Sequence, residues 1–493
     1  MTTKRIEGWL FVLMFVSYAY FYQAGGWNQN SRFNLVRAIT NEHSLQVDPF
    51  QRDTGDKAVY GGHFYSDKAP GQALAAVPSV LVARGVMALL GMDPESYAGI
   101  ALLSYLATVF TSGLFTALGV VVLFRVAETL GATRGGALFA AITCGLGTPM
   151  WSLATLLIGH ALSASCLVFA FAAALAVGVA DQRRDAQLAL VVGLGAGWAT
   201  VSDFPAAVPA VILAVLAALN AWPLGHARAT RILVVLIAAA SACAAVLAAY
   251  QYACFGSPFH VAYSSEQGFE GMRQGLFGIS APRLFRLREI LLGAYRGLLP
   301  LAPALLAAPL GLVVMLRAGT RARRAALAAG TVAAYYVLLN ASYTYWEGGW
   351  SYGPRHLSPA LPFICLWLAF LWAVARRLGR AALVTLAAWG VAMSLVAVAT
   401  MNQPPGSFHR PMAELLWPAF ADGDLSLNRQ RFTDGGADAG ALRVHGPRKA
   451  AWNLGMKVGL DGHASLAPLG IIWVLCGLGL CTALREPDVV RAT

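Results

Sequence analysis

The sequence predicts an all-α integral membrane protein, built from about 12 to 13 transmembrane helices. Two observations support this. First, 58% of the 493 residues are hydrophobic and only 12% are charged, with a mean hydropathy of +0.60, whereas soluble domains usually carry about 25% charged residues. Second, the basic residues gather in short turns between long apolar runs, which is the pattern of cytoplasmic loops in membrane proteins.

The apolar runs give the predicted spans in order. A transmembrane helix needs about 20 apolar residues. Runs of suitable length lie near 9–25, 72–90, 98–124, 135–153, 156–180, 187–202, 204–222, 231–250, 296–316, 326–342, 358–375, 381–400 and 467–485. The first run follows Lys4 and Arg5 and has no small-x-small cleavage site after it, so it is interpreted as a span and not as a signal peptide.

Arginine-rich turns orient these spans. They place 181–186, 225–231, 317–325, 376–380 and 485–493 in the cytoplasm. The long polar stretches 26–71, 251–295, 343–357 and 401–466 then share the extracytoplasmic face. Thirteen spans that start inside cannot also end inside, so one segment does not cross. The segment 72–90, which Pro78 and Arg84 interrupt, is the expected exception.

Three regions follow from this layout. Residues 1–400 form a transmembrane module with its first extracytoplasmic loop at 26–71, residues 401–466 form an outer loop or small cap, and residues 467–493 form the last transmembrane helix and a cytoplasmic tail. The net charge of +12 is spread over separate turns without a contiguous basic face, which argues against nucleic acid as a partner. The seven cysteines lie almost entirely in apolar runs without metal-ligand spacing, so they are predicted to be small buried side chains.

The first loop combines carboxylates with cations. It carries Asp48, Asp56 and Asp67, the last of them between Tyr65 and Lys68, and Arg32 lies near its start. A carboxylate can take a proton from a hydroxyl, and cations can hold a departing phosphate. The alternative is a solvated loop with an ordinary Asp-Lys pair at the start of a helix.

A second group lies in the aromatic, glycine-rich run 345–356. Its glycines allow the backbone to approach a ligand closely, and its side chains include Glu347, Trp350 and Tyr352. Aromatic rings can stack on sugars, and Arg355 can hold a phosphate through two hydrogen bonds. The alternative is a turn in the aromatic belt at the membrane interface, with Arg355 as an anchor.

Ionisable residues near membrane depth form a third group. His160 lies just inside an apolar run, and Asp203 marks the break between two short helices. Such groups are costly in a membrane and mark functional sites, although at the outer ends of helices water reduces this cost. In the loop 251–296 an amphipathic surface helix is predicted at 281–293, and Arg296 is either an interface anchor or a second phosphate ligand.

Several short motifs resemble those of the GT-C superfamily, the multispan glycosyltransferases that use polyprenyl-phosphate sugars, and among them the protein O-mannosyltransferases and the aminoarabinose transferases. The run Phe64-Tyr65-Ser66-Asp67-Lys68-Ala69-Pro70 is similar to the motif that closes their first loop, with Lys68 on the family's lysine. Further similar stretches are GTPMW to GHA (147–161), GLFG (275–278) and YGPR (352–355). One departure stands out: where the family usually carries an acidic pair, this chain has Asn28, Gln29 and Asn30, and an amide cannot act as a base.

The resemblance implies a GT-C-type bundle with outer-face surface helices in the first loop, in a bacterial cytoplasmic (inner) membrane. It implies an inverting glycosyltransferase that moves a sugar from a polyprenyl-phosphate donor to a cell-envelope acceptor, which is a glycan, a lipid or a protein, at the extracytoplasmic face. Membrane lipids are its other partners.

The implied site has three parts. The catalytic base is a carboxylate, Asp67 by preference and otherwise Asp56 or Asp48. The donor phosphate is bound by Lys68, Arg355, Arg32 and His160. Substrate is contacted by Tyr65, Glu347, Trp350, Tyr352, Asp203 and Arg296. No cofactor is required, because the leaving phosphate is already a stable anion; some relatives use a divalent metal, so metal dependence stays open. The alternatives are a lipid or solute transporter or flippase, which predicts charges in mid-membrane and repeat symmetry, and a non-catalytic scaffold.

Overall fold

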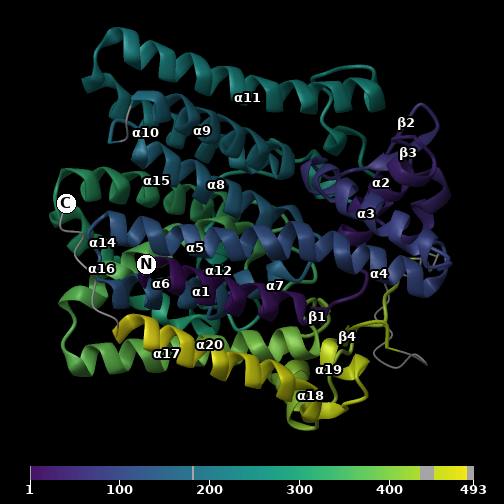
Figure 1. Ribbon diagram of the computed structural model, residues 1–493. Coiled ribbons are helices and arrows are strands. Elements are labelled where there is room, and N and C mark those ends of the chain that lie inside the picture. Colours follow the sequence, from purple (N-terminus) through teal and green to yellow (C-terminus); the bar gives the residue numbers. More distant parts are fainter. Residues whose placement is uncertain (1, 180–181, 433–448, 486–493) are drawn as a thin grey trace.

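The computed structural model describes residues 2–179, 182–432 and 449–485. Long helices lie side by side and form a bundle (Figure 1). One end of the bundle, here called the loop end, carries the described parts of the polar stretches 20–70, 257–300, 343–356 and 401–466. The other end, here called the arginine end, carries the short basic turns. There Arg228 forms an ion pair with the buried Asp185, and Arg324 donates a hydrogen bond to Asn220.

Within the described residues, the chain makes twelve helical passes between the two ends. These passes are α1 (Thr2–Ala19), α4 with α5 (Tyr97–Thr108 and Leu114–Thr129), α6 with α7 (Arg134–Leu146 and Met150–Ala154), α8 (Gly159–Ala176), α9 (Gln182–Ser202), α10 (Ala207–Ala221), α11 (His226–Phe255), α14 (Ala308–Arg317), α15 (Thr320–Ser342), α16 (Leu361–Val374), α17 (Arg377–Thr400) and α20 (Ala467–Arg485). An even number returns the chain to the end where it started. The predicted membrane bundle of about 12 to 13 helices is thus confirmed.

Nine helices of the described residues have the length and hydropathy of a membrane span. Eight of them belong to the passes above, and the ninth is α3 (Gly71–Leu89). At its start, Gln72 donates hydrogen bonds to Thr111 and Ser112, at 2.8 and 2.9 Å, just beyond the end of α4. Helices α3 and α4 therefore form a helical hairpin, in which the start of α3 and the end of α4 lie at the same depth in the bundle. As expected for 72–90, α3 does not cross between the two ends.

The first loop contains the predicted surface helices and also a β-hairpin, which the all-α prediction did not include. Helix α2 (Trp27–Asn41) and a 3-10 turn (Asp48–Asp53) precede the strands β2 (Lys57–Tyr60) and β3 (His63–Ser66). Gly61 and Gly62 connect the strands with positive φ angles of 60° and 86°, which a two-residue hairpin turn of this kind requires.

The remaining elements lie mostly at the loop end. The predicted amphipathic helix at 281–293 is α12 (Leu284–Leu292), and α13 (Leu298–Leu301) follows it. Beyond α17 come α18 (Trp417–Ala421) and α19 (Leu454–Lys457). Strand β1 (Phe21–Tyr22) pairs with β4 (Trp452–Asn453), which joins segments from opposite halves of the chain. Residues 433–448 of the predicted outer loop and 486–493 of the predicted tail lie outside the described residues.

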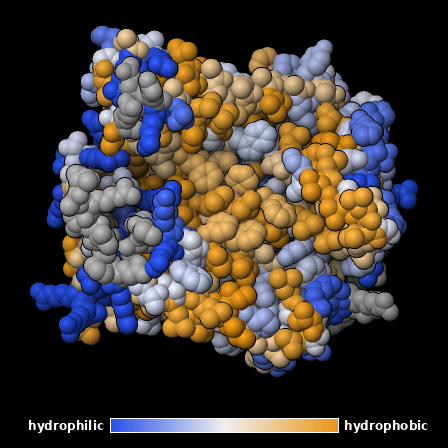
Figure 2. All heavy atoms as spheres, viewed as in Figure 1, coloured by the Kyte–Doolittle hydropathy of each residue, from blue (hydrophilic) through white to orange (hydrophobic). Residues whose placement is uncertain are grey.

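Apolar side chains hold the bundle together. The largest buried cluster spans α1, α5, α6, α8 and α16, with Trp151, Phe124 and Phe363 among its fully buried members. Figure 2 shows hydrophobic residues across the middle of the visible face and hydrophilic residues toward both ends, as expected for a helix bundle in a bilayer. Six of the seven cysteines are buried as predicted, while Cys481 is exposed on α20.

Candidate active site

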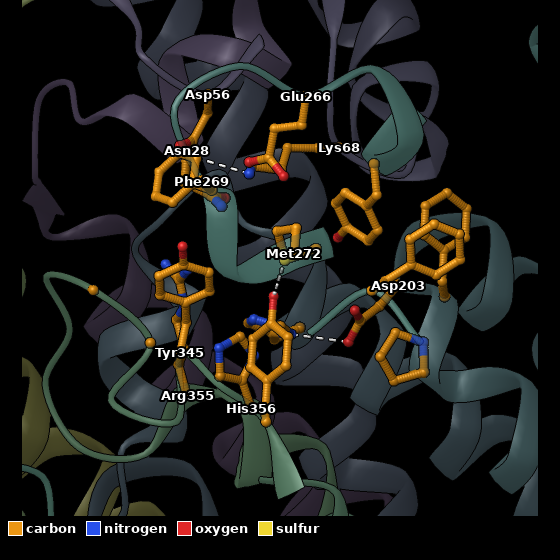
Figure 3. A pocket seen from close by; sticks show the side chains of 18 of the residues that line it. Asn28, Asp56, Lys68, Asp203, Glu266, Phe269, Met272, Tyr345, Arg355 and His356 are labelled. Atoms are coloured by element: carbon orange, nitrogen blue, oxygen red, sulfur yellow. Dashed lines mark hydrogen bonds and ion pairs between the residues drawn. The ribbon is translucent and has the colours of Figure 1, made fainter. Parts of the chain in front are cut away.

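A cavity of about 930 Å³ opens at the loop end. Its walls come from α2, the hairpin β2–β3, the starts of α8 and α10, the segment 258–279, the end of α15 and the run 343–356 (Figure 3). Of the residues predicted from the sequence, the ones that line it are Arg32, Asp56, Lys68, His160, Asp203, Glu347, Trp350 and Arg355. The structure therefore brings together residues that are far apart in the chain.

Lys68 lies at the centre of a group of carboxylates. Its Nζ is 3.0 Å from Asp56 Oδ2 and 2.5 Å from Asp67 Oδ2. The hairpin register explains this arrangement, because Lys57 pairs with Ser66 and the two aspartates are the next residues outward. Asp67 is fully buried, accepts a hydrogen bond from Ser31 at 3.1 Å, and does not line the cavity.

Electrostatics in this group follow from burial and proximity. Burial raises the pKa of the Asp67 carboxyl, Asp56 adds to the rise, and Lys68 offsets it only in part. Burial alone would lower the pKa of Lys68, but Asp56 and Asp67 outweigh it and raise this pKa. Lys68 is therefore a permanent cation at the edge of the cavity.

Glu266 is a third carboxylate of the group, and the sequence-based prediction did not include it among the site residues. An isolated β-bridge joins Glu266 to Ala58 of β2, which holds it on the same side of the cavity as Asp56 and Lys68 (Figure 3). Its Oε2 atom is buried and has no hydrogen-bond partner among the described residues. Burial, followed by the neighbouring Asp67, raises the pKa of Glu266 to about 8.

Two arginines on the cavity wall have no carboxylate partner within the described residues. Arg32 is 5% exposed, and it donates hydrogen bonds only to Asn28. The Nε atoms of Arg32 and Arg355 are both buried without a partner. Burial lowers the pKa of Arg32; Tyr263, Asp67 and Asp203 offset this only in part, and the positive charge of Arg355 lowers the pKa further. An anion between the two guanidinium groups would relieve this repulsion and satisfy the free donors.

His160 and Asp203 form a pair on another wall of the cavity. His160 Nδ1 lies 2.9 Å from Asp203 Oδ2. The pair forms because α8 begins directly against the end of α9: a Cβ added at Gly159 would lie 2.2 Å from the carbonyl oxygen of Ser202. Only glycine permits this close contact.

The other predicted site residues lie outside the cavity lining. Asp48 binds His63 Nδ1 at 2.7 Å and the Phe64 amide at 2.6 Å, and Tyr65 is buried against Phe255. Tyr352 is buried within a hydrophobic cluster.

Arg296, a further predicted site residue, is also fully buried, at 1% exposed. It donates hydrogen bonds to the carbonyl oxygens of Gly349, at 3.0 Å, and Pro404, at 3.4 Å. Burial lowers its pKa to about 10. It supports the loop that carries Trp350 and lies behind the cavity wall.

The lining also includes aromatic side chains that the sequence-based prediction did not place among the site residues, such as Tyr263, Phe269 and Tyr343. The run 345–356 was recognised by its aromatic content, whereas the segment 258–279 was recognised only through the motif GLFG (275–278). As for a metal, the described residues contain no group of three or more His, Cys, Asp or Glu side chains arranged to hold one. Asp56 and Asp67 instead lie against the ammonium group of Lys68.

Comparisons with known proteins bear on the fold. No protein-family model matches the sequence, and no curated protein matches it. Several solved structures do match, and two of them are structures of ArnT. ArnT from Cupriavidus metallidurans bound to undecaprenyl phosphate aligns with a TM-score of 0.53 and 15% identity, covering 97% of this chain and 76% of ArnT. ArnT in the apo state aligns with a TM-score of 0.51 and 15% identity, covering 96% and 74%. This chain therefore has the fold of ArnT, which confirms the GT-C-type bundle predicted from its sequence.

Proposed function

We infer that this protein is an integral membrane glycosyltransferase that moves a sugar from a polyprenyl-phosphate donor to a cell-envelope acceptor. The observation that carries this proposal is the pair Arg32 and Arg355, a buried and a half-buried cation that form no ion pair with a carboxylate among the described residues, in a cavity that reaches into the membrane bundle. Buried guanidinium nitrogens without a partner favour the binding of an anion. The matching ArnT structure is bound to undecaprenyl phosphate, which supports a lipid phosphate as that anion.

The lining of the cavity suits such a donor. Ala207, Leu247 and Leu339 line the part that lies between the helices, so an acyl or prenyl chain can extend there beside apolar side chains. Arg32, Arg355 and the imidazole of His160 surround the place of the phosphate. The sugar then lies toward polar and aromatic groups, namely Asn28, Glu347 and Trp350.

The proposed reaction is a single displacement. The acceptor oxygen attacks the anomeric carbon, the bond from that carbon to the phosphate oxygen breaks, and polyprenyl phosphate leaves with the electron pair. Arg32 and Arg355 stabilise the charge that develops on the phosphate, and a carboxylate takes the acceptor proton. Inversion at the anomeric carbon follows, because attack and departure occur on opposite faces.

The basic turns at the arginine end support a cytoplasmic location for that end. The loop end and its cavity then face the outside of the bacterial cytoplasmic membrane. A transporter or flippase is less well supported, because most charged groups of the cavity lie in loop-end segments and not at the middle of the passes.

The test uses the full chain in lipid nanodiscs and a panel of labelled polyprenyl-phosphate sugars, with release of free polyprenyl phosphate as the readout. We expect turnover with at least one donor, and binding of polyprenyl phosphate that weakens by about 10-fold or more in Arg32→Gln and Arg355→Gln. Arg288→Gln is the matched control, because the Arg288 side chain is 66% exposed, forms an ion pair with Glu289 and does not line the cavity. Absence of release from every donor overturns the proposed function. Unchanged phosphate binding in both cavity variants overturns the phosphate site.

A further inference from the structure

We propose that the acceptor is a sugar hydroxyl, that it enters through a second, smaller cavity, and that Glu266 is the base that takes its proton. This inference rests on the proposed function and assigns its acceptor site and its catalytic carboxylate.

The smaller cavity measures about 250 Å³ and adjoins the large one. The two share a wall, which is made of Tyr263, Glu266, Phe269, Met272, Leu276 and Phe277. Ser264, Gly268 and Glu270 line only the smaller cavity, and all three are exposed. The smaller cavity is thus open to water, whereas the large one extends between membrane helices. A water-borne acceptor and a lipid-borne donor can therefore approach Glu266 from different sides.

Glu266 is the carboxylate best placed to act as the base. Asp67 is fully buried and lines neither cavity. Asp56 lines only the large cavity, and Lys68 holds its carboxylate at 3.0 Å. Glu266 lines both cavities and has no ion pair among the described residues. An ion pair stabilises the charged form of a carboxylate and so weakens it as a base, which favours Glu266 over Asp56.

The position of Glu266 relative to Arg355 also fits the chemistry. Figure 3 shows Glu266 and Lys68 on one side of the cavity, with Arg355 and His356 on the other and Met272 between them. A single displacement needs the base beside the attacking oxygen and the cations beside the leaving phosphate, on opposite faces of the anomeric carbon. The acceptor O–H bond breaks with its proton going to the Glu266 carboxylate, and the oxygen forms the new bond to the anomeric carbon. The electron pair of the broken carbon–oxygen bond leaves with the phosphate.

The lining of the smaller cavity indicates the class of acceptor. The rings of Tyr263, Phe269 and Phe277 offer apolar faces, while Ser264 and Glu270 offer hydrogen-bond acceptors for hydroxyl groups. Apolar ring faces combined with hydroxyl-binding groups are what a carbohydrate requires. The volume lies just below the range of about 300–1,000 Å³ usual for drug-sized ligands, which suits one sugar residue at the end of a glycan.

The base is tested with Glu266→Gln and Glu266→Ala in nanodiscs, against the exposed Glu414→Gln as control. We expect Glu266→Gln to slow transfer to a glycan acceptor by about 100-fold or more, while its Kd for polyprenyl phosphate stays within about twofold of the parent value. Azide provides the decisive comparison, because this anion attacks the anomeric carbon without needing a base. Glu266→Ala should therefore form glycosyl azide and release polyprenyl phosphate as fast as the parent protein.

The acceptor cavity is tested with Ser264→Phe, which places a ring in the smaller cavity. The matched control is Gln267→Phe, since Gln267 is exposed in the same segment and lines neither cavity. Ser264→Phe should raise the KM for the glycan acceptor by about 10-fold, with donor binding and the azide reaction unchanged.

The possible results distinguish a failure of the proposed function from a failure of the base or of the acceptor cavity. If the parent protein releases no polyprenyl phosphate from any donor, the proposed function fails. If the parent is active but Glu266→Gln keeps full transfer, or if Glu266→Ala also loses the azide reaction, Glu266 is not the base. If Ser264→Phe leaves the acceptor KM unchanged, the smaller cavity is not the acceptor site.

Discussion

The Nδ1 atom of His160 lies 2.9 Å from Oδ2 of Asp203, and this contact connects the start of α8 to the end of α9. A carboxylate on one ring nitrogen holds the imidazole ring in one orientation. The same contact leaves Nε2 as the atom that is free to meet a ligand in the cavity.

Asp203→Asn should therefore weaken donor binding. The imidazole loses the carboxylate that holds its orientation, so the ring is less well placed to contact a phosphate. We expect the Kd for polyprenyl phosphate to rise by about 10-fold, in line with a lost hydrogen bond to a charged group. Isothermal titration in nanodiscs measures this change, with the exposed Asp461→Asn as control. Unchanged affinity would show that the pair has no part in donor binding.

Asn28→Asp places a carboxylate at the start of α2, where the GT-C superfamily usually carries an acidic pair. The variant tests whether this carboxylate acts as a base or as a counter-ion. Asn28 Oδ1 accepts a hydrogen bond from Arg32, so an aspartate at this position would form an ion pair with that guanidinium. We expect an approximately 10-fold loss of affinity for polyprenyl phosphate and no gain in turnover. Asn41→Asp, at the far end of the same helix, adds the same charge outside the cavity. Faster turnover in Asn28→Asp would contradict this expectation.

Transfer should depend on pH through Glu266. Burial and Asp67 raise the pKa of this carboxyl to about 8, so below that pH it is protonated and cannot accept a proton. The kcat/KM for the glycan acceptor should rise with pH and level off above about pH 8. The azide reaction should stay flat over the same range, because it needs no base. An acceptor profile that is flat between about pH 6 and pH 9 would contradict the assignment.

Replacing either of two glycines in the bundle with alanine should change the stability of the protein, in opposite directions. A Cβ at Gly311 in α14 would lie 2.1 Å from the carbonyl oxygen of Trp367 in α16, whereas a Cβ at Gly330 in α15 would have nothing within 4 Å. Gly311→Ala should therefore destabilise the protein by about 1–3 kcal/mol through overpacking. Gly330→Ala should stabilise it by about 0.5–1 kcal/mol through helix propensity. Thermal unfolding in detergent measures both, and equal melting temperatures would refute the packing argument.

The passes of the fold were predictable from the sequence because a bilayer imposes length and hydropathy on each helix. His160 and Asp203 were identified for the same reason, since ionisable groups are rare in apolar runs. Glu266 was missed because its place depends on one β-bridge to Ala58, which no local pattern reveals. Tyr352 and Arg296 were chosen by residue type, but burial in the core and backbone hydrogen bonds take them out of the cavity lining.

The pairing of β1 with β4 has a consequence for biosynthesis. Phe21 and Tyr22 find their strand partners only at Asn453 and Trp452, and the hydroxyl of Tyr20 donates to the carbonyl oxygen of Ser465 at 2.6 Å. Helices enter the membrane in the order of their synthesis. More than 400 further residues (from position 22 to position 452) must therefore be synthesised before β1, at the outer end of the first helix, can pair with β4. A ribosome that stalls before β4 would therefore leave a nascent chain in which every earlier helix is inserted but β1 has no strand partner. Quality-control proteases can recognise such an incompletely folded chain.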